Sequence, residues 1–225
     1  MQLSDKDIDR YSRNIILPEI GGEGQYKLLQ SKVLVIGMGG LGSPLLMYLA
    51  AAGIGNITII DNDNVELSNL QRQVIHSTQN IGRPQVDSAE SFIGKINPEI
   101  KITKINSRVD ANNIIELIAS QDIVADGSDN FKTRFLVADT CYKLKKTLIS
   151  AAITKYEGQI STWKNNKNLP CYRCLFADEP NHNNVNNCSS NGVLGSVGGV
   201  FGSLQATEVI KEILNNGSSL SGFLN

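Results

Sequence analysis

The sequence predicts an α/β fold: a Rossmann-like doubly wound sheet that is mostly parallel and gains antiparallel strands toward the C-terminus. Three observations support this. Residues 32–37 form a short β-branched apolar run that breaks into glycine, and residues 43–52 form a small-residue stretch typical of a helix, closed by Gly53. Asn56–Asp61 supplies a second strand, completing a βαβ unit of about 30 residues. Helix and strand patterns alternate beyond it.

The elements after this unit follow in order. Helices are expected at residues 85–96, 111–119, 130–145 and 203–214, and strands at residues 101–105, 122–126, 147–154 and 157–164. The strands at residues 101–105 and 122–126 extend the parallel sheet. The last two are separated only by Lys155 and Tyr156, which predicts a hairpin and antiparallel pairing. The final helix has six apolar residues on one face, so it is expected to pack on the sheet.

The 225 residues show no internal repeat and no separable linker, so a single domain over residues 1–225 is expected. Residues 1–31 are expected to be an N-terminal helical segment, because Ser4 opens a charged stretch with capping residues. Residues from about 165 to 191 are rich in Asn, Pro and Asp. They predict a long crossover loop.

Charge and hydropathy exclude several classes of protein. The 21 Lys and Arg residues nearly balance the 22 Asp and Glu residues, giving a net charge of -1, which argues against nucleic-acid binding. No apolar run approaches the roughly 20 residues that a membrane-spanning helix needs, and the polar N-terminus is unlike a signal peptide. A cytoplasmic protein without membrane or nucleic-acid partners is therefore expected.

The strongest local motif is a glycine loop. Gly37, Gly39, Gly40 and Gly42 satisfy G-x-G-x-x-G directly after a strand and at the start of a helix, and Asp61 follows nineteen residues past the third glycine of the pattern. Glycines let backbone N–H groups approach a phosphate at a helix N-terminus, while a carboxylate at the end of the second strand accepts from ribose hydroxyls. The motif predicts nucleotide binding.

The residues after Asp61 bear on the choice between a dinucleotide and ATP. Asp63, Asn69 and Arg72 lie in a stretch far more polar than a strand-to-helix connection requires. Arg72 can neutralise phosphate oxygens with its planar fork, and Asn69 adds an amide donor. A triphosphate is favoured. Two alternatives stay open. The polar segment could be only a solvated loop, and the glycine loop by itself is also compatible with an NAD-dependent oxidoreductase.

Together these motifs resemble the ThiF/MoeB/HesA family, bacterial relatives of the ubiquitin-activating enzymes. The resemblance covers roughly residues 8–214. Its motifs are Arg10-Tyr-Ser-Arg13-Asn, the glycine loop, Asp61-x-Asp63, Ser68-Asn-Leu-Gln-Arg72-Gln, Asp126-Gly-Ser-Asp129-Asn, Cys171-x-x-Cys174 and Gly202-Ser-Leu-Gln-Ala. Several separated motifs in one order are far more specific than any single one.

The resemblance implies an enzyme that binds ATP and Mg²⁺ and adenylylates the C-terminal glycine of a small ubiquitin-like sulfur-carrier protein, ThiS- or MoaD-like, in thiamine or molybdopterin biosynthesis. Asp61 would then hold the ribose and Asp129 the Mg²⁺. Asn69 and Arg72 would contact phosphates, with Gly39 and Gly40 beside the nucleotide. Arg13 would enter the partner subunit's site in a homodimer. Because the attacking carboxylate is already ionised, no general base is needed, and a solvated structural role is expected for His76 and His182.

One departure from the family pattern concerns charge at the phosphates. Relatives carry a lysine in a Gly-x-Pro-Lys setting, whereas here Gly82-Arg-Pro84 is followed by Gln85. Gln85 can still donate a hydrogen bond, but losing a cation there forfeits roughly 1.5 to 3 kcal/mol. A nucleotide-binding relative with weakened or lost adenylylation is therefore the main alternative.

A second departure concerns the cysteines. Relatives complete a zinc site with a second Cys-x-x-Cys, which this chain lacks, so Cys171 and Cys174 supply two of the four ligands that structural zinc requires. His182 and Cys188 are candidates for the other two, and zinc binding stays open. Cys188 also resembles the cysteine that links to the carrier's tail in some relatives; a nucleophile and an inert thiol both stay open. Cys141 is expected to be buried in a helix.

Overall fold

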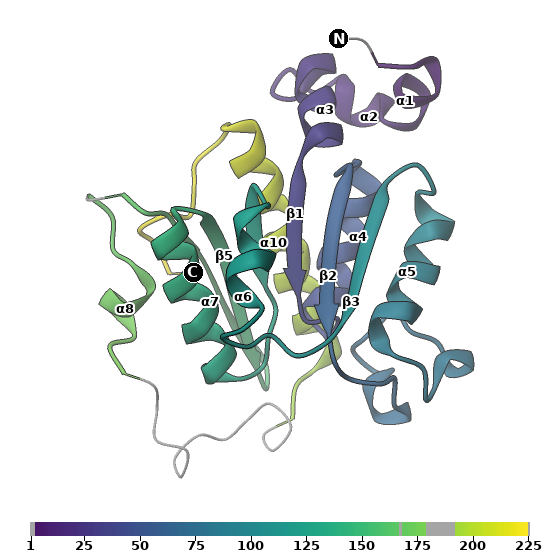
Figure 1. Ribbon diagram of the computed structural model, residues 1–225. Helices are drawn as coiled ribbons and strands as arrows, with labels where there is room; N and C mark the ends of the chain where they lie inside the picture. The colour runs from purple at the N-terminus through teal and green to yellow at the C-terminus, as the bar shows by residue number, and fades with distance from the viewer. Residues whose placement is uncertain (1–2, 167, 179–191, 225) are drawn as a thin grey trace.

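The computed structural model describes residues 3–166, 168–178 and 192–224, and its centre is a six-stranded sheet with the order β3-β2-β1-β4-β5-β6 (Figure 1). The strands are β1 (Lys32–Ile36), β2 (Asn56–Asp61), β3 (Lys101–Asn106), β4 (Ile123–Asp126), β5 (Thr147–Thr154) and β6 (Glu157–Trp163). Strands β1 to β5 are parallel to one another, and β6 pairs antiparallel with β5. The predicted doubly wound, mostly parallel sheet is confirmed, with the change of direction at β6.

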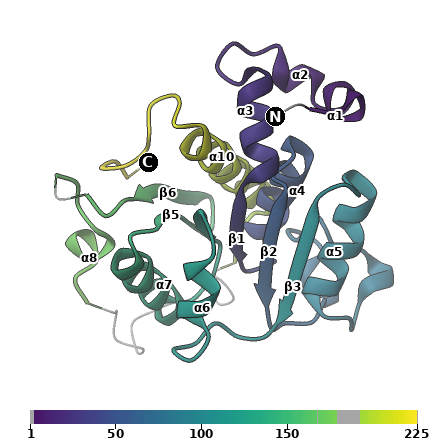
Figure 2. The same ribbon diagram turned by 45° about the horizontal axis from the view of Figure 1, so that its top comes forward.

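Helices cover both faces of this sheet (Figures 1 and 2). They are α1 (Asp5–Arg10), α2 (Ser12–Ile15), α3 (Gly21–Gln30), α4 (Gly42–Ala52), α5 (Gln85–Ile96), α6 (Ile114–Ala119), α7 (Phe131–Leu144), α8 (Tyr172–Leu175) and α10 (Gly195–Leu214). The first three form the predicted N-terminal helical segment, and the Ser4 side chain caps α1 as expected. Within the described ranges, no helix combines the length and the apolar character needed to cross a bilayer.

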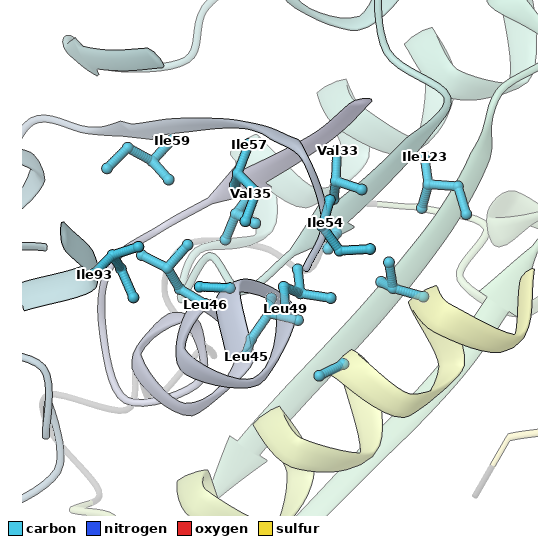
Figure 3. Close-up of a cluster of buried hydrophobic side chains, with 14 of the residues drawn as sticks. Val33, Val35, Leu45, Leu46, Leu49, Ile54, Ile57, Ile59, Ile93 and Ile123 are labelled. Atoms are coloured by element: carbon cyan, nitrogen blue, oxygen red, sulfur yellow. The ribbon is translucent and has the colours of Figure 1, made fainter. Parts of the chain in front are cut away.

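Two hydrophobic clusters fill the space between helices and sheet, one on each face. Val33 and Val35 of β1 belong to the cluster under α4, α5 and α10. Leu34 and Ile36, which alternate with them, belong to the cluster under α6 and α7. Figure 3 shows the first cluster, with residues of α4 such as Leu45 packed toward β1 and β2. Because both faces of β1 are buried, its sequence is apolar throughout, as a central parallel strand requires.

The strand order places a crevice at a defined position. From β1 the chain moves to β2 and β3 on one side, and then returns to β4 and β5 on the other. The connections after β1 and β4 therefore diverge to opposite faces of the sheet. In doubly wound folds this reversal leaves a ligand-binding crevice outside the carboxyl ends of the strands.

The last helix is longer than expected. The sequence pattern predicts it over residues 203–214, but α10 begins at Gly195 and includes most of the glycine-dense segment before Ser203. A Cβ atom on Gly198 would lie 2.8 Å from the Gly40 oxygen, and one on Gly202 would lie 2.5 Å from the Leu41 oxygen. Glycine disfavours helices when exposed, but here its small size lets α10 pack closely against the glycine loop and α4.

The predicted crossover loop is only partly irregular. Its described portion contains α8, and Tyr172 at the start of that helix is buried against Phe135 and Trp163, with ring centroids 5.3 and 5.4 Å apart. This aromatic packing holds a segment whose composition is otherwise typical of a loop. Residues 167 and 179–191, with His182 and Cys188, lie outside the described residues.

The glycine loop depends on one close approach. Gly37 has a φ of 86°, in the left-handed region, and a Cβ on Gly42 would lie 1.8 Å from the Gly37 oxygen. Such an overlap is impossible without moving backbone. Gly42 therefore sets the distance between the end of β1 and the first turn of α4.

We predict that Gly42→Ala lowers the free energy of unfolding by about 3 kcal/mol or more, because the backbone of the loop must move. Gly94→Ala in α5 is the matched control: nothing lies within 4 Å of its added Cβ, and the substitution should stabilise the chain by about 0.5 to 1 kcal/mol. Urea denaturation of the variants measures both changes. Equal stability of Gly42→Ala and the parent chain would contradict this account of the loop.

Candidate nucleotide-binding site

A cleft of about 560 Å³ lies at the carboxyl ends of the central strands. Its walls are the glycine loop after β1, the polar segment after β2, the turn after β4 and the first turn of α7. Residues 107–109 after β3 and Val193 before α10 also line it. The cleft therefore occupies the crevice that the strand order creates.

Three of the four predicted glycines reach this cleft. Gly37, Gly39 and Gly40 line it, whereas Gly42 is buried and acts only through the close approach described above. The loop is tied to its surroundings by backbone bonds, since the Gly37 N–H donates to Ile60 at 3.0 Å and the Gly39 carbonyl accepts from Ser43 at 2.9 Å. These two bonds hold the loop at Gly37 and at Gly39, on either side of Met38.

Asp61 lies at the end of β2, where its carboxylate closes the neighbouring turn. Its two oxygens accept from the N–H groups of Met38 at 2.7 Å and Asp63 at 2.8 Å. Burial raises the pKa of Asp61, and these backbone donors partly offset the effect. Each carboxylate oxygen has a second lone pair, so Asp61 keeps acceptor capacity for a hydroxyl in the cleft. Asp63 is exposed and also lines the cleft.

Asn69 and Arg72 come from the polar segment, which folds into a short 3₁₀ turn at Leu67–Asn69. The Asn69 carbonyl accepts from the N–H of Arg72 at 3.1 Å, and the Arg72 guanidinium donates to the Ser68 carbonyl at 3.1 Å. The Arg72 side chain packs over Gly40, where an added Cβ would lie 3.3 Å from the Arg72 Cγ. Both residues line the cleft, and the remaining guanidinium donors suit an anion there.

Asp129 lies on the turn after β4 and is exposed in the cleft. Among the described residues it forms no ion pair, and a free carboxylate beside a phosphate site is the ligand that protein-bound Mg²⁺ ordinarily uses. The residues present therefore fit a magnesium ion. Its binding here stays a prediction.

The turn that presents Asp129 rests on a buried carboxylate with a cation nearby, an arrangement that the sequence did not reveal. Asp126, 1% exposed, accepts from the N–H of Ser128 at 2.9 Å, and the guanidinium of Arg134 donates to the Ser128 carbonyl. Burial raises the pKa of Asp126, and the Arg134 cation partly offsets it. Gln205 of α10 also donates to the Asp126 carbonyl at 2.9 Å. Arg134 itself lines the cleft.

Other cleft residues were also missed. Arg108 and Gln73 line the cleft, although neither was predicted to be in the site. Arg108 follows β3, so its position at the end of a parallel strand was an available signal. Gln73 immediately follows Arg72, but only its burial beside Gly39 shows that it belongs to the site.

Gln85 is in the cleft wall, at the first residue of α5. It is 2% exposed, its amide nitrogen donates to the Asn64 carbonyl at a long 3.4 Å, and its side chain lies close enough to His76 to raise the pKa of that residue, although its amide oxygen has no hydrogen-bond partner of ordinary geometry among the described residues. A buried polar atom without a partner is costly, so the site is better satisfied when a ligand or water contacts Gln85.

Arg13 does not line this cleft. It lies on the short helix α2 with an exposed side chain, among the N-terminal helices. The predicted entry of Arg13 into a partner's site requires a second copy of the chain, and it stays a prediction.

The cysteines that the structure describes lie away from the cleft. The sulfurs of Cys171 and Cys174 are 3.2 Å apart, and a hydrogen bond from Cys171 lowers the pKa of Cys174. No group of three or more His, Cys, Asp or Glu side chains suited to a metal occurs within the described part of the chain. Two thiols do not by themselves fit a structural zinc ion, and Cys188 lies outside the described residues. Cys141 is buried in α7, as predicted.

The expectation of a solvated His76 is wrong. Its side chain is buried beneath the glycine loop, with both ring nitrogens in hydrogen bonds. The packing of α5 against the loop makes the position interior.

Comparison with known proteins places this architecture among named relatives. The chain is 45% identical over 224 residues to the SAMP-activating enzyme E1 of Haloferax volcanii, covering 100% of this chain and 82% of that protein. It is 46% identical over 223 residues to the adenylyltransferase and sulfurtransferase MOCS3 of Culex quinquefasciatus, covering 99% of this chain but 51% of the relative. It therefore spans only about half the length of that relative.

Solved structures agree with the sequence comparison. A crystal structure of E. coli MccB with ATP superimposes with a TM-score of 0.81 at 27% identity, covering 94% of this chain and 65% of that one. The model of the ThiF family matches residues 11–225. Since that match takes in nearly the whole chain, and relatives near 45% identity cover it fully, this protein belongs to the ThiF family.

Proposed function

We propose that this chain uses ATP to adenylylate the C-terminal glycine of a small ubiquitin-like sulfur-carrier protein, for sulfur transfer in thiamine or molybdopterin biosynthesis. The observation that carries the proposal is the convergence of the glycine loop, Asp61, Arg72 and Asp129 on one cleft at the reversal of strand order. The named relatives, an E1 enzyme and an adenylyltransferase, support the same reaction class.

The reaction is a displacement at phosphorus. A carboxylate oxygen of the carrier forms a bond to the α-phosphorus, the bond to the bridging oxygen of the β-phosphate breaks, and pyrophosphate leaves with its electron pair. The attacking group is already ionised at neutral pH, so the site needs no base. The main barrier is repulsion between anions, which Arg72 is placed to reduce.

The remaining groups bind and orient. Asp61 accepts from ribose hydroxyls, and Asn69 donates to phosphate oxygens beside Arg72. Asp129 would hold a Mg²⁺ ion, whose charge offsets that of the phosphates when it is bound. We further propose a homodimer in which the exposed Arg13 of one copy completes the cleft of the other. Cys188 as a nucleophile and zinc at Cys171 and Cys174 stay predictions.

The first test is exchange of labelled pyrophosphate into ATP, dependent on a ThiS- or MoaD-type carrier. Arg72→Ala should lower kcat/KM for exchange about ten- to hundredfold, because a charged hydrogen bond to phosphate is lost. Arg83→Ala is the control: this arginine is exposed and outside the cleft lining, and exchange should stay at the parent level.

Two results would count against the proposed adenylylation activity. Absence of exchange with both carriers, despite measurable ATP binding, would favour the nucleotide-binding relative that has lost adenylylation. Tight binding of NADH without affinity for ATP would instead favour an oxidoreductase.

A second test addresses the missing lysine. Gln85→Lys should raise the exchange rate up to about tenfold, because an ammonium group at this buried wall position would lie close to the phosphates. Gln85→Met keeps the length and removes the amide, which separates charge from hydrogen bonding. Exchange that is unchanged or lower in Gln85→Lys would show that the native amide already meets the needs of the site.

A third test addresses the support of Asp129. Arg134→Met should lower the free energy of unfolding by about 1 to 3 kcal/mol at pH 7, because the Ser128 carbonyl loses its donor and the buried Asp126 loses the nearby cation. The folded-state pKa of Asp126 is raised above its unfolded value, so its stabilising contribution is present at low pH and is lost as the pH rises. The deficit should therefore shrink as the pH falls from 7 toward about 4.

Arg173→Met is the matched control, since its ion pair with Asp139 is more than a third exposed and should contribute at most about 1 kcal/mol. Urea denaturation across this pH range gives both curves. If the deficit for Arg134→Met is constant with pH, Arg134 has no electrostatic effect on the buried Asp126 carboxyl.

A further inference from the structure

A buried histidine lies directly behind the glycine loop. His76 is 7% exposed, and its Nε2 lies 3.2 Å from the carbonyl oxygen of Met38. Its Nδ1 lies 2.9 Å from the hydroxyl of Ser88, a buried residue of α5. The imidazole therefore connects α5 to the second residue of the glycine loop. Neither the proposed reaction nor the resemblance gives His76 a part.

The two contacts fix the proton of the imidazole. A carbonyl oxygen only accepts, so Nε2 must carry hydrogen and donate to Met38. Nδ1 is then free to accept from the Ser88 hydroxyl. Burial lowers the pKa of His76, which keeps the ring neutral with its proton on Nε2. Donation to Met38 is thus a permanent feature of the folded chain.

The consequence for the cleft follows from peptide geometry. The peptide bond between Met38 and Gly39 is trans, so the Met38 carbonyl and the Gly39 N–H point in opposite directions. Met38 is buried, whereas Gly39 lines the cleft. Holding the carbonyl against His76 therefore directs the Gly39 N–H into the cleft. That N–H has no acceptor among the described residues.

This peptide needs such support because its flanking residues are flexible. Met38 lies between Gly37 and Gly39, and glycine gives the backbone little preference for one orientation. The only other donor near the Met38 carbonyl in the described residues is the Ser43 hydroxyl, at 3.4 Å, which is long for a hydroxyl hydrogen bond. His76 is the stronger constraint.

We propose that His76 is a positioning residue that aims the Gly39 N–H at a phosphate group of the bound nucleotide. It acts through Met38 and does not touch the ligand. The identity of that ligand as ATP rests on the proposed function. An N–H that is already oriented contributes to phosphate binding without reorganisation when the ligand enters.

Calorimetric titration of the full chain with ATP and, separately, with adenosine tests the proposal. His76→Phe removes the donor and should weaken ATP binding about five- to tenfold, the effect of one hydrogen bond, while adenosine binding is unchanged. His76→Gln places an amide donor near the position of Nε2 and should recover most of the ATP affinity. Ser88→Ala, which frees the ring without emptying its site, should weaken ATP binding about two- to threefold.

Thr162→Val is the matched control. Thr162 lies on the edge strand β6, outside the cleft lining, and the substitution deletes its buried hydrogen bond to Glu208 of α10. It should lower stability without changing the ratio of ATP to adenosine affinity. The positioning role would be overturned if His76→Phe binds ATP as tightly as the parent chain does. It would also be overturned if this variant loses affinity for ATP and for adenosine equally. If His76→Phe does not fold, parent-level ATP binding by Ser88→Ala overturns it. If the parent chain binds ATP no more tightly than adenosine, the result would instead contradict the proposed function.

Discussion

The site depends on the close approach of two glycines at the end of the first strand. The Gly37 oxygen lies where a side chain on Gly42 would begin, so the chain can leave β1 and enter α4 only along one path. That path brings backbone groups to the edge of the cleft and gives α10 a surface that its own glycines can approach. A single steric constraint thus sets the positions of a strand, two helices and the cleft wall between them.

The turns beside this loop are both held by a carboxylate that accepts from backbone N–H groups. Asp61 and Asp126 end β2 and β4, the two strands that flank β1, and the carboxylate of each accepts from backbone N–H groups nearby: two for Asp61 and one for Asp126. Burial raises the pKa of both carboxyls, and the backbone donors and Arg134 offset that effect. Because the turns are held from within, the groups facing the cleft are free to meet a ligand. Buried carboxylates build the site, and exposed ones such as Asp129 are available to act in it.

Most of the predicted site residues line one cleft, because their positions follow from topology. Residues that come directly after parallel strands meet at one edge of the sheet, so knowing where β2 and β4 end is enough to bring Asp61 and Asp129 together there. Arg134 and His76 were not placed, because their burial depends on which neighbouring element covers them. The length of α10 was underestimated for the same reason: packing against the glycine loop overrides the low helix propensity of its first turns.

The amino-acid sequence by itself determined the alternation of strands and helices, the family motifs and the candidate ligands of a nucleotide, since each depends on residue type and local spacing. Tertiary structure decided which peptide groups face the cleft, which charges are buried and which polar atoms lack partners. These properties arise from contacts between segments far apart in the chain, as when His76 and Asp61 together fix the peptide groups of Met38. Local patterns do not encode such contacts, because burial and orientation exist only once the sheet and its helices have packed.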